Sequence, residues 1–438
     1  MQRQLHLNLF IQSRGHHEAS WRHPDASALD LADIDYYREL ALSAEAACFD
    51  AIFLADVLAL DQDYQHAARN WLEPVTALSA LAGATRHIGL IGTVSTTYTE
   101  PFNLARQFAS LDHISRGRAG WNVVTSSSAA AARNYSGDSQ RSHADRYACA
   151  EEFMQVVKAL WDSWTDDAVV DDRTTGRYIS ATGVRAVDHS GEHYQVTGPF
   201  NLPRSPQGWP VLVQAGSSST GRQFAARHAE AVFTAHMDKA LAQEFYADLK
   251  RLAELAGRHA DSVLILPGVS PVIASTESEA HRYADELNAL SDPEVGRSRL
   301  SYRFGGQDFS HLALDKVLVA EDFPATDTVE ASRSRTEVIV GLVRKEPLTL
   351  RQLLAKLASA RGHFTLAGTP EQVADHIESW FVEGAADGFN IMPPVLPAMF
   401  TPFVDEVLPL LRQRGLFRRK YAGVTLRDHY GLKRPSGR

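Results

Sequence analysis

The chain has 438 residues, of which 44% are hydrophobic and 22% charged, and its formal net charge is −9 at pH 7. This composition is typical of an ordinary globular protein and excludes fibrous and low-complexity classes. Basic residues gather only in the short run 418–420, which argues against nucleic-acid binding, and no apolar run approaches the ~20 residues of a membrane span.

The first residues run directly into alternating apolar positions at 5–9, a pattern of a strand rather than of a signal peptide. The cysteines, Cys48 and Cys149, each lie among alanines in a helical pattern. We interpret both as small buried apolar side chains rather than as a disulfide or as metal ligands. We therefore expect a cytoplasmic enzyme without a metal site.

Short apolar runs alternate with amphipathic stretches along most of the chain. The expected strands are residues 5–11, 51–55, 88–94, 119–125, 211–215, 231–235, 263–273 and 388–392. The expected helices are residues 34–47, 74–84, 102–114, 143–164, 221–229, 239–256, 277–290 and 371–383. This alternation predicts an α/β protein with eight parallel strands closed into a (β/α)8 TIM barrel. A doubly wound open sheet is the alternative, and the absence of GxGxxG after the first strand disfavours it.

Two segments interrupt this alternation within what we expect to be a single domain over residues 1–438. Residues 165–210 are rich in Asp, Gly, Thr and Pro and predict a long excursion with a hairpin. Residues 291–347 are polar and predict a late insertion. We expect both to cover the C-terminal face of the barrel as substrate lids, because barrel enzymes carry function on their βα loops. The basic tail, residues 416–438, is expected to contact a neighbouring subunit.

Polar side chains gather where the expected strands end. Asp56 follows the second strand, Thr93 and Thr97 share one face of the third if it stays extended, and Asn122 and Ser126 end the fourth. The C-terminal ends of barrel strands are where such enzymes place their chemistry. Turn capping remains the alternative for the aspartate and the threonines.

A second group of polar residues predicts an anion site. Gly216, Ser217 and Ser218 separate a strand from a helix, and backbone amides at a helix start attract phosphate. The alternative is a simple serine N-cap. His143 and Tyr147 lie four residues apart in a helical pattern, so both side chains face one way.

Other chemistries lack their signatures. His16 and His17 follow the first strand without the HxxxH or HExxH spacing of a zinc site. The chain has no GxSxG motif, no P-loop and no isolated pair of carboxylates at strand ends. A phosphate-binding rim with many hydroxyls and few charges instead favours a large phosphorylated cofactor that supplies the chemistry itself.

Several motifs together resemble the bacterial-luciferase-like flavin monooxygenases. They are FLAD at 53–56, STTYTEP at 95–101, GWNVVTS at 120–126, HADRY at 143–147 and QAGSS at 214–218. Within this family the chain resembles the group that contains nitrilotriacetate monooxygenase component A, dibenzothiophene-sulfone monooxygenase and long-chain alkane monooxygenase. The likeness covers residues 5–432.

The resemblance implies a flavin-dependent monooxygenase with a (β/α)8 barrel and insertions. Reduced FMN would arrive by diffusion from a separate NAD(P)H:flavin reductase, and O2 would be the co-substrate. Oxygenation of a small organic substrate would proceed through a flavin C4a-peroxide or hydroperoxide. Relatives of this kind imply a homodimer or homotetramer. Two alternatives stay open: a deazaflavin-dependent oxidoreductase on the same barrel, and a non-catalytic flavin-binding protein.

The resemblance also implies roles for particular residues. The flavin contacts carry over to Asp56, Thr93, Thr97, Asn122, Ser126, His143, Tyr147, Gly216, Ser217 and Ser218. His16 corresponds to a family position near the reactive face of the flavin, which implies a catalytic role in proton donation or peroxide stabilisation. Arg297, Arg299 and Arg303 in the late insertion form either a solvated basic face or partners for a substrate carboxylate.

Overall fold

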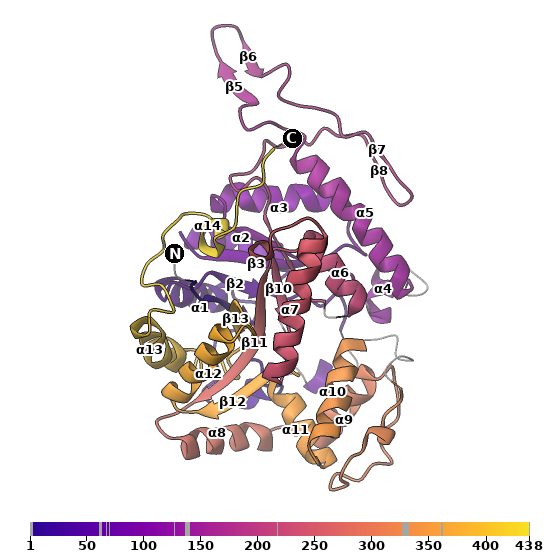
Figure 1. Cartoon of the computed structure of the whole chain (residues 1–438), viewed down its shortest axis with the longest axis vertical. Coiled ribbons are helices and arrows are strands. Elements are labelled where there is room, and N and C mark those ends of the chain that lie inside the picture. Colours follow the sequence, from indigo (N-terminus) through magenta and orange to yellow (C-terminus); the bar gives the residue numbers. More distant parts are fainter. Residues whose placement is uncertain are drawn as a thin grey trace.

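Eight parallel strands form a closed barrel in the computed structural model of the chain (Figure 1). In barrel order they are β1 (His6–Ile11), β2 (Ala51–Leu54), β3 (Gly89–Ser95), β4 (Ala119–Val124), β9 (Val211–Gln214), β10 (Ala231–Thr234), β11 (Leu264–Ile273) and β13 (Gly388–Ile391). The barrel closes because β13 pairs with both β1 and β11. The expected TIM barrel and its eight strand segments are thereby confirmed.

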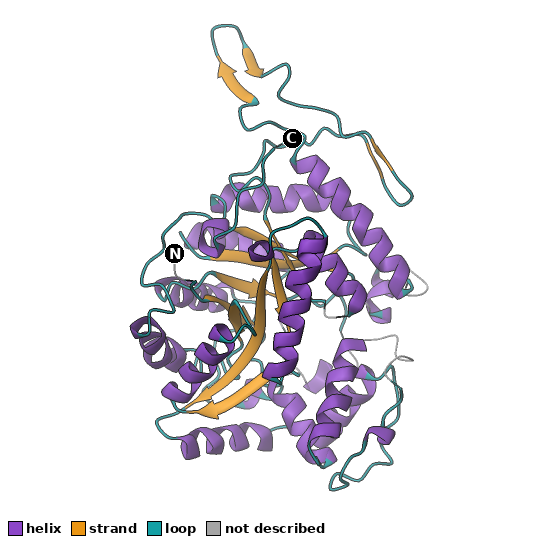
Figure 2. Cartoon of the chain, in the orientation of Figure 1, coloured by secondary structure: helices purple, strands orange, loops and turns teal. Residues whose placement is uncertain are grey.

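Helices lie around the outside of this barrel and at both of its ends (Figure 2). They are α1 (Ile34–Ala46), α2 (Pro74–Ala84), α3 (Pro101–Ser115), α4 (Ala129–Asn134), α5 (His143–Trp161), α6 (Ser219–His228), α7 (Lys239–Leu255), α8 (Glu277–Ala289), α9 (Pro293–Arg303), α10 (Arg333–Lys345), α11 (Leu350–Ala360), α12 (Pro370–Val382), α13 (Leu408–Gln413) and α14 (Leu426–Tyr430). The structure describes residues 3–60, 64–66, 68–69, 71–126, 128–135, 141–216, 218–325, 333–360 and 362–437. Within these residues no helix is long and apolar enough to cross a lipid bilayer.

The strands are apolar on both faces because each face is covered. Trp121 of β4 is fully buried and packs outward against Phe108 of α3 and Phe153 of α5, with ring centroids 5.8 and 5.9 Å away. Inside the barrel, Phe10 and Phe233 meet edge to face at 5.5 Å. Parallel strands buried on both faces give the continuous apolar runs that made them recognisable.

An additional strand, β12 (Phe364–Gly368), lies outside the closed barrel and was not expected from the sequence. It pairs with the C-terminal half of β11, which continues past the barrel rim. Helices α9, α10 and α11 lie near the same end and share a separate apolar cluster (Figure 1). The late insertion therefore sits at the C-terminal end of the strands, where Arg303 pairs with Glu18 in the loop after β1.

The earlier excursion, residues 165–210, leaves the barrel at the opposite end, so its expected position over the C-terminal face was wrong. Gln207 lies beside the first residue of β4, where its Nε2 donates to the carbonyl of Ala119 at 2.9 Å. The physical reason is the direction of α5, which runs antiparallel to the strands and returns the chain to their N-terminal ends. A segment inserted between a barrel helix and the next strand must emerge there.

Two hairpins decorate this excursion. One, β5 (Val169–Asp172) with β6 (Arg177–Ile179), projects away from the body of the molecule (Figure 1). The other, β7 (His189–Ser190) with β8 (Gln195–Val196), lies against α5, where the hydroxyl of Tyr194 is 3.1 Å from Sγ of Cys149.

Helix α14 closes the N-terminal end of the barrel. Leu426 and Tyr430 are buried in the same apolar cluster as Phe10. A Cβ atom added to Gly89 or to Gly120 would come within 2.5 or 3.2 Å of the Leu426 side chain, so these two glycines make room for it. The part of the basic tail that forms α14 thus packs beneath its own barrel, and contact of the tail with a neighbouring subunit stays a prediction.

A chain of hydrogen bonds ties this floor helix to the strands. The hydroxyl of Tyr430 donates to Oδ1 of Asn8 at 2.8 Å, and Nδ2 of Asn8 donates to Oδ1 of Asn390 at 3.1 Å. Nδ2 of Asn390 in turn donates to the carbonyl of Leu266 at 2.9 Å. These buried polar groups satisfy one another, which removes the cost of placing them inside a barrel.

Replacing Leu426 by Ala tests whether α14 is part of the folded core. The change leaves a cavity beneath the barrel and should lower the free energy of unfolding by about 2–5 kcal/mol. Urea denaturation followed by circular dichroism measures the loss. The control is Val424→Ala two residues earlier, which is 66% exposed and should change stability by less than about 0.5 kcal/mol. Equal, small effects of both variants would contradict a floor role for α14.

Candidate active site

The start of α6 forms a polar cradle. Ser218 caps the helix, because its Oγ accepts a hydrogen bond from the amide of Gly221 at 3.1 Å. The Tyr147 hydroxyl from α5 reaches the same place and hydrogen-bonds with the side chains of Ser218 and Thr125. Burial raises the pKa of the Tyr147 phenol, and these two hydrogen bonds oppose the rise. The phenol is therefore a neutral donor at physiological pH.

Glycines keep this cradle open. A Cβ atom added to Gly221 would lie 3.0 Å from the Tyr147 hydroxyl and 3.1 Å from Oγ of Ser218. A Cβ atom on Gly216 would come within 2.2 Å of Nε2 of Gln214. Side chains at these positions would fill the space in front of the helix amides, so the cradle suits an anion that approaches the backbone closely.

Contacts between the middle of α5 and the end of α6 hold the two helices together. Glu151 of α5 accepts from Arg227 at 2.9 Å and from His228 at 2.8 Å, both near the end of α6. Burial opposes ionisation, yet the hydrogen bonds from His228 and Arg227 lower the pKa of Glu151 to about 2. These contacts fix Tyr147, one helical turn before Glu151, relative to the Ser218 cap.

A second polar group lies at the ends of β3 and β4. Nδ2 of Asn122 donates to Oγ1 of Thr93 at 2.9 Å, and the Thr93 hydroxyl donates to the carbonyl of Leu54 at 3.0 Å. Both side chains are at most 4% exposed. The structure therefore brings together two of the residues that the sequence nominated and fixes which way the Asn122 amide points.

Buried oxygens without partners concentrate at this end of the barrel. Thr97 Oγ1, Asn122 Oδ1, Gln214 Oε1 and Thr234 Oγ1 have no hydrogen-bond partner within the described residues. They lie in or just past the C-terminal halves of β3, β4, β9 and β10, which are consecutive strands around the barrel. We call these four atoms the oxygen arc. A buried polar group without a partner costs about 1–3 kcal/mol, so the arc needs a bound group to complete it.

Two members of the oxygen arc were missed by the sequence analysis. Gln214 and Thr234 are the last residues of β9 and β10, and both are at most 5% exposed. The available signal was a polar side chain ending an apolar run, the same signal that nominated Asn122. His236, two residues beyond β10, was also missed, and burial lowers its pKa to about 4.

His16 is fully buried at the end of β1. Its Nε2 lies 2.9 Å from the carbonyl of Phe10, and its ring packs edge to face against Phe10 at 4.6 Å. These contacts fix the imidazole close to the barrel mouth. Its catalytic role stays a prediction.

The remaining nominated residues are less tightly placed. Asp56 is half-buried, and burial raises the pKa of its carboxyl group. Ser126 is half-buried just past β4. His143 is exposed at the first turn of α5, with its ring 4.9 Å from that of Tyr147. Ser217 lies outside the described residues.

The arginines of the late insertion are not a solvated basic face. Arg297 donates from Nη1 to the carbonyls of Phe309 and Leu312, so it stabilises the insertion itself. Arg299 and Arg303 both pair with Glu18 in the loop after β1. Such pairs join residues about 280 positions apart in the sequence, which no local pattern could reveal.

The cradle and the oxygen arc together fit a phosphorylated flavin. Helix amides, the Ser218 hydroxyl and the Tyr147 phenol match a phosphate group, because all are donors without negative charge. Amide and hydroxyl groups such as those of Asn122, Gln214 and Thr97 match the carbonyl and N–H edge of a flavin ring.

Comparisons with known proteins agree with this geometry. The chain matches the family described as luciferase-like monooxygenase over residues 7–388. It is 46% identical over 436 residues to the N-acetyl-S-(2-succino)cysteine monooxygenase of Bacillus subtilis (strain 168), covering 100% of this chain and 98% of that protein. It is 46% identical over 445 aligned residues to nitrilotriacetate monooxygenase component A of Aminobacter aminovorans, covering 99% and 97% of the two chains.

A solved structure supports the same conclusion. The crystal structure of a riboflavin lyase with modified FMN and the substrate riboflavin is 32% identical, with a TM-score of 0.88 over 99% of this chain and 97% of the other. The expected resemblance is thus confirmed over nearly the whole length. This chain belongs to the luciferase-like monooxygenase family and is a flavin-dependent monooxygenase.

Proposed function

We propose that the chain is the oxygenase of a two-component system. It binds reduced FMN made by a separate NAD(P)H:flavin reductase and oxygenates a small organic substrate with O2, through a flavin C4a-peroxide or hydroperoxide. The oxygen arc beside the α6 cradle carries this proposal, because it presents unmet hydrogen bonds next to a phosphate-shaped site. The name of one relative, component A of a monooxygenase, supports a separate reductase.

Each part of the site has a physical task in this proposal. The α6 amides, Ser218 and Tyr147 bind the phosphate, while Asn122 and Thr97 hydrogen-bond the flavin ring. His16 faces the reactive side and handles protons. The late insertion above the mouth excludes water, which protects a reactive intermediate from hydrolysis or premature release. The other nominated contacts, Asp56, Thr93, Ser126, His143, Gly216 and Ser217, belong to the same proposed shell.

We further propose a small organic acid as substrate. N-acetyl-S-(2-succino)cysteine and nitrilotriacetate, the compounds for which the two relatives are named, both carry carboxylates. A cytoplasmic location, where a reductase has NAD(P)H, and a homodimeric or homotetrameric assembly complete the proposal.

A reductase-coupled assay tests the reaction class. The purified chain with NADH alone should leave an organic acid unchanged, and addition of a flavin reductase, FMN and O2 should start its consumption, with catalase present to remove peroxide. Mass spectrometry with isotopically labelled O2 should find label in the product. Turnover without a reductase, or in the absence of O2, would instead favour the deazaflavin-type alternative.

Tyr147→Phe tests the phosphate cradle. Loss of a charge-assisted hydrogen bond should weaken binding of reduced FMN by about 1–2 kcal/mol. Anaerobic fluorescence titration measures the affinity. Reduced riboflavin, which lacks the phosphate, should bind the variant and the parent equally. Tyr178→Phe on the projecting hairpin, 63% exposed, is the control. Unchanged affinity for reduced FMN would remove Tyr147 from the cradle.

Gln214→Leu separates a ligand-binding amide from a structural one. Since Oε1 of Gln214 is buried and has no partner within the described residues, the variant should be at least as stable as the parent. Its affinity for reduced FMN should fall by about 0.5–1.5 kcal/mol. The control is Gln207→Leu at the other end of the barrel, whose amide donates to Asp112 and Ala119. That variant should lose stability and keep its flavin affinity; the reverse pattern would contradict the assignment.

A further inference from the structure

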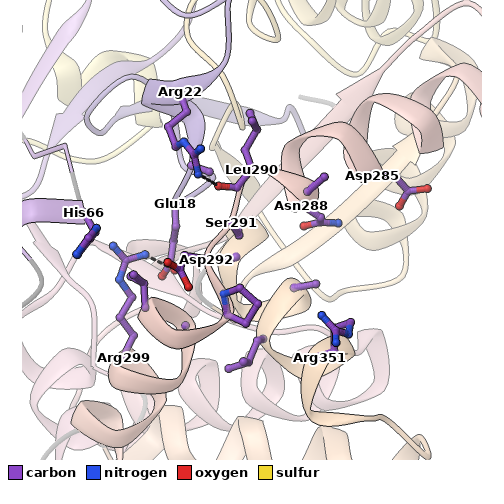
Figure 3. Close-up of a pocket in the computed structure, with 18 of the residues that line it drawn as sticks. Glu18, Arg22, His66, Asp285, Asn288, Leu290, Ser291, Asp292, Arg299 and Arg351 are labelled. Atoms are coloured by element: carbon purple, nitrogen blue, oxygen red, sulfur yellow. Dashed lines mark hydrogen bonds and ion pairs between the residues drawn. The ribbon is translucent and has the colours of Figure 1, made fainter. Parts of the chain in front are cut away.

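We propose that a cavity between the β1 loop and the late insertion binds a small organic polycarboxylate, with Arg299 as its principal carboxylate ligand. The cavity has a volume of about 830 Å³, within the range of small-molecule sites (Figure 3). It begins at Glu18, two residues after His16, and is bounded by the end of α8, the start of α9 and one face of α11. The inference rests on the proposed function, because it locates that enzyme's substrate.

Three arginines from three separate segments line the cavity. Arg22 comes from the β1 loop, Arg299 from α9 and Arg351 from the first turn of α11. Arg22 donates to the carbonyl of Leu290, which holds its guanidinium at the wall (Figure 3). The ion pair of Arg351 with Asp315 is 3.4 Å long and both side chains are more than half exposed, so it binds Arg351 weakly.

Within the protein itself, Arg299 already binds one carboxylate, that of Glu18. Glu18 pairs with Arg299 at the cavity wall and also with Arg303, 3.3 Å away, which does not line the cavity. A guanidinium has five donors in a fixed fork, so Arg299 can bind a second carboxylate while it stays paired with Glu18.

The other acidic residues of the cavity do not oppose an anion strongly. Asp292 is exposed, so solvent and salt screen its charge, and its Oδ1 accepts the amide of Glu294 at 2.8 Å in capping α9. Asp285 is exposed near the end of α8. The first turns of both α9 and α11 line the cavity, and helix N-termini carry partial positive charge that favours carboxylates.

The rest of the wall suits the carbon skeleton of an organic acid. Trp21, Leu354 and Ala355 contribute apolar surface, and the buried hydroxyl of Ser291 has no hydrogen-bond partner within the described residues. A site with separated cations, an apolar wall and one spare hydroxyl selects compounds with two or more carboxylates on a short chain.

Calorimetry on the full chain tests the site with succinate, iminodiacetate and tricarballylate, and with trimethyl tricarballylate as a neutral counterpart of equal skeleton. We expect tricarballylate to bind at least tenfold more tightly than its ester, and the difference to shrink as salt is raised. Arg299→Gln should weaken tricarballylate binding at least tenfold. Arg303→Gln breaks a pair with the same Glu18 outside the cavity, so it should stay within about twofold of the parent.

Three results would overturn the carboxylate site. Equal weakening by Arg299→Gln and Arg303→Gln would show that the Glu18 pairs only hold the insertion in place, and equal binding of acid and ester, or no binding of any acid, would also overturn the site. Should Arg299→Gln fail to fold, Arg351→Gln at an exposed position replaces it, with a threefold or greater loss expected. The affinity for reduced FMN, measured on the same samples, should be the same in the variants and in the parent. A parent chain that does not bind reduced FMN at all would instead contradict the proposed function.

Discussion

Inside the barrel, partnered and unpartnered polar side chains lie toward opposite ends, and the rest of the structure depends on this asymmetry. At the N-terminal end Tyr430, Asn8 and Asn390 satisfy one another in a closed chain that ends on a strand carbonyl. At the C-terminal end the oxygen arc lacks protein partners. A folded protein tolerates such a deficit only where a ligand or water completes it, so the asymmetry assigns stability to one end and binding to the other.

Contacts between α5 and α6 fix the geometry of the phosphate cradle. The Glu151–Arg227 ion pair and the hydrogen bond between His228 and Glu151 join α5 to α6, and the same two helices carry Tyr147 and the Ser218 cap near their N-termini. A phosphate cradle made from two helices is useful only if their separation is fixed, because hydrogen bonds weaken steeply with misalignment. The Glu151 contacts do not bind the ligand, but they determine the distance between Tyr147 and Ser218, which do.

The sequence predicted the barrel well because strands buried on both faces are continuous apolar runs, and all eight were recognised. It missed β12, whose short run lies beside a polar insertion, and it misplaced the excursion of residues 165–210 because apolar periodicity does not record the direction of α5. In the site, Asn122 and Tyr147 were found from local pattern and resemblance. The pairing of Arg299 and Arg303 with Glu18 depends on a contact between distant segments, which local pattern does not contain.

The floor helix has a consequence for biosynthesis. Residues of α14 follow all eight barrel strands in the chain, yet Leu426 occupies the space that Gly89 and Gly120 leave inside the barrel. While the ribosome is still translating the segment before α14, the cylinder has an uncovered apolar base. Completion of the core must therefore wait until translation has passed α14, and during that interval the open base is a natural target for chaperones.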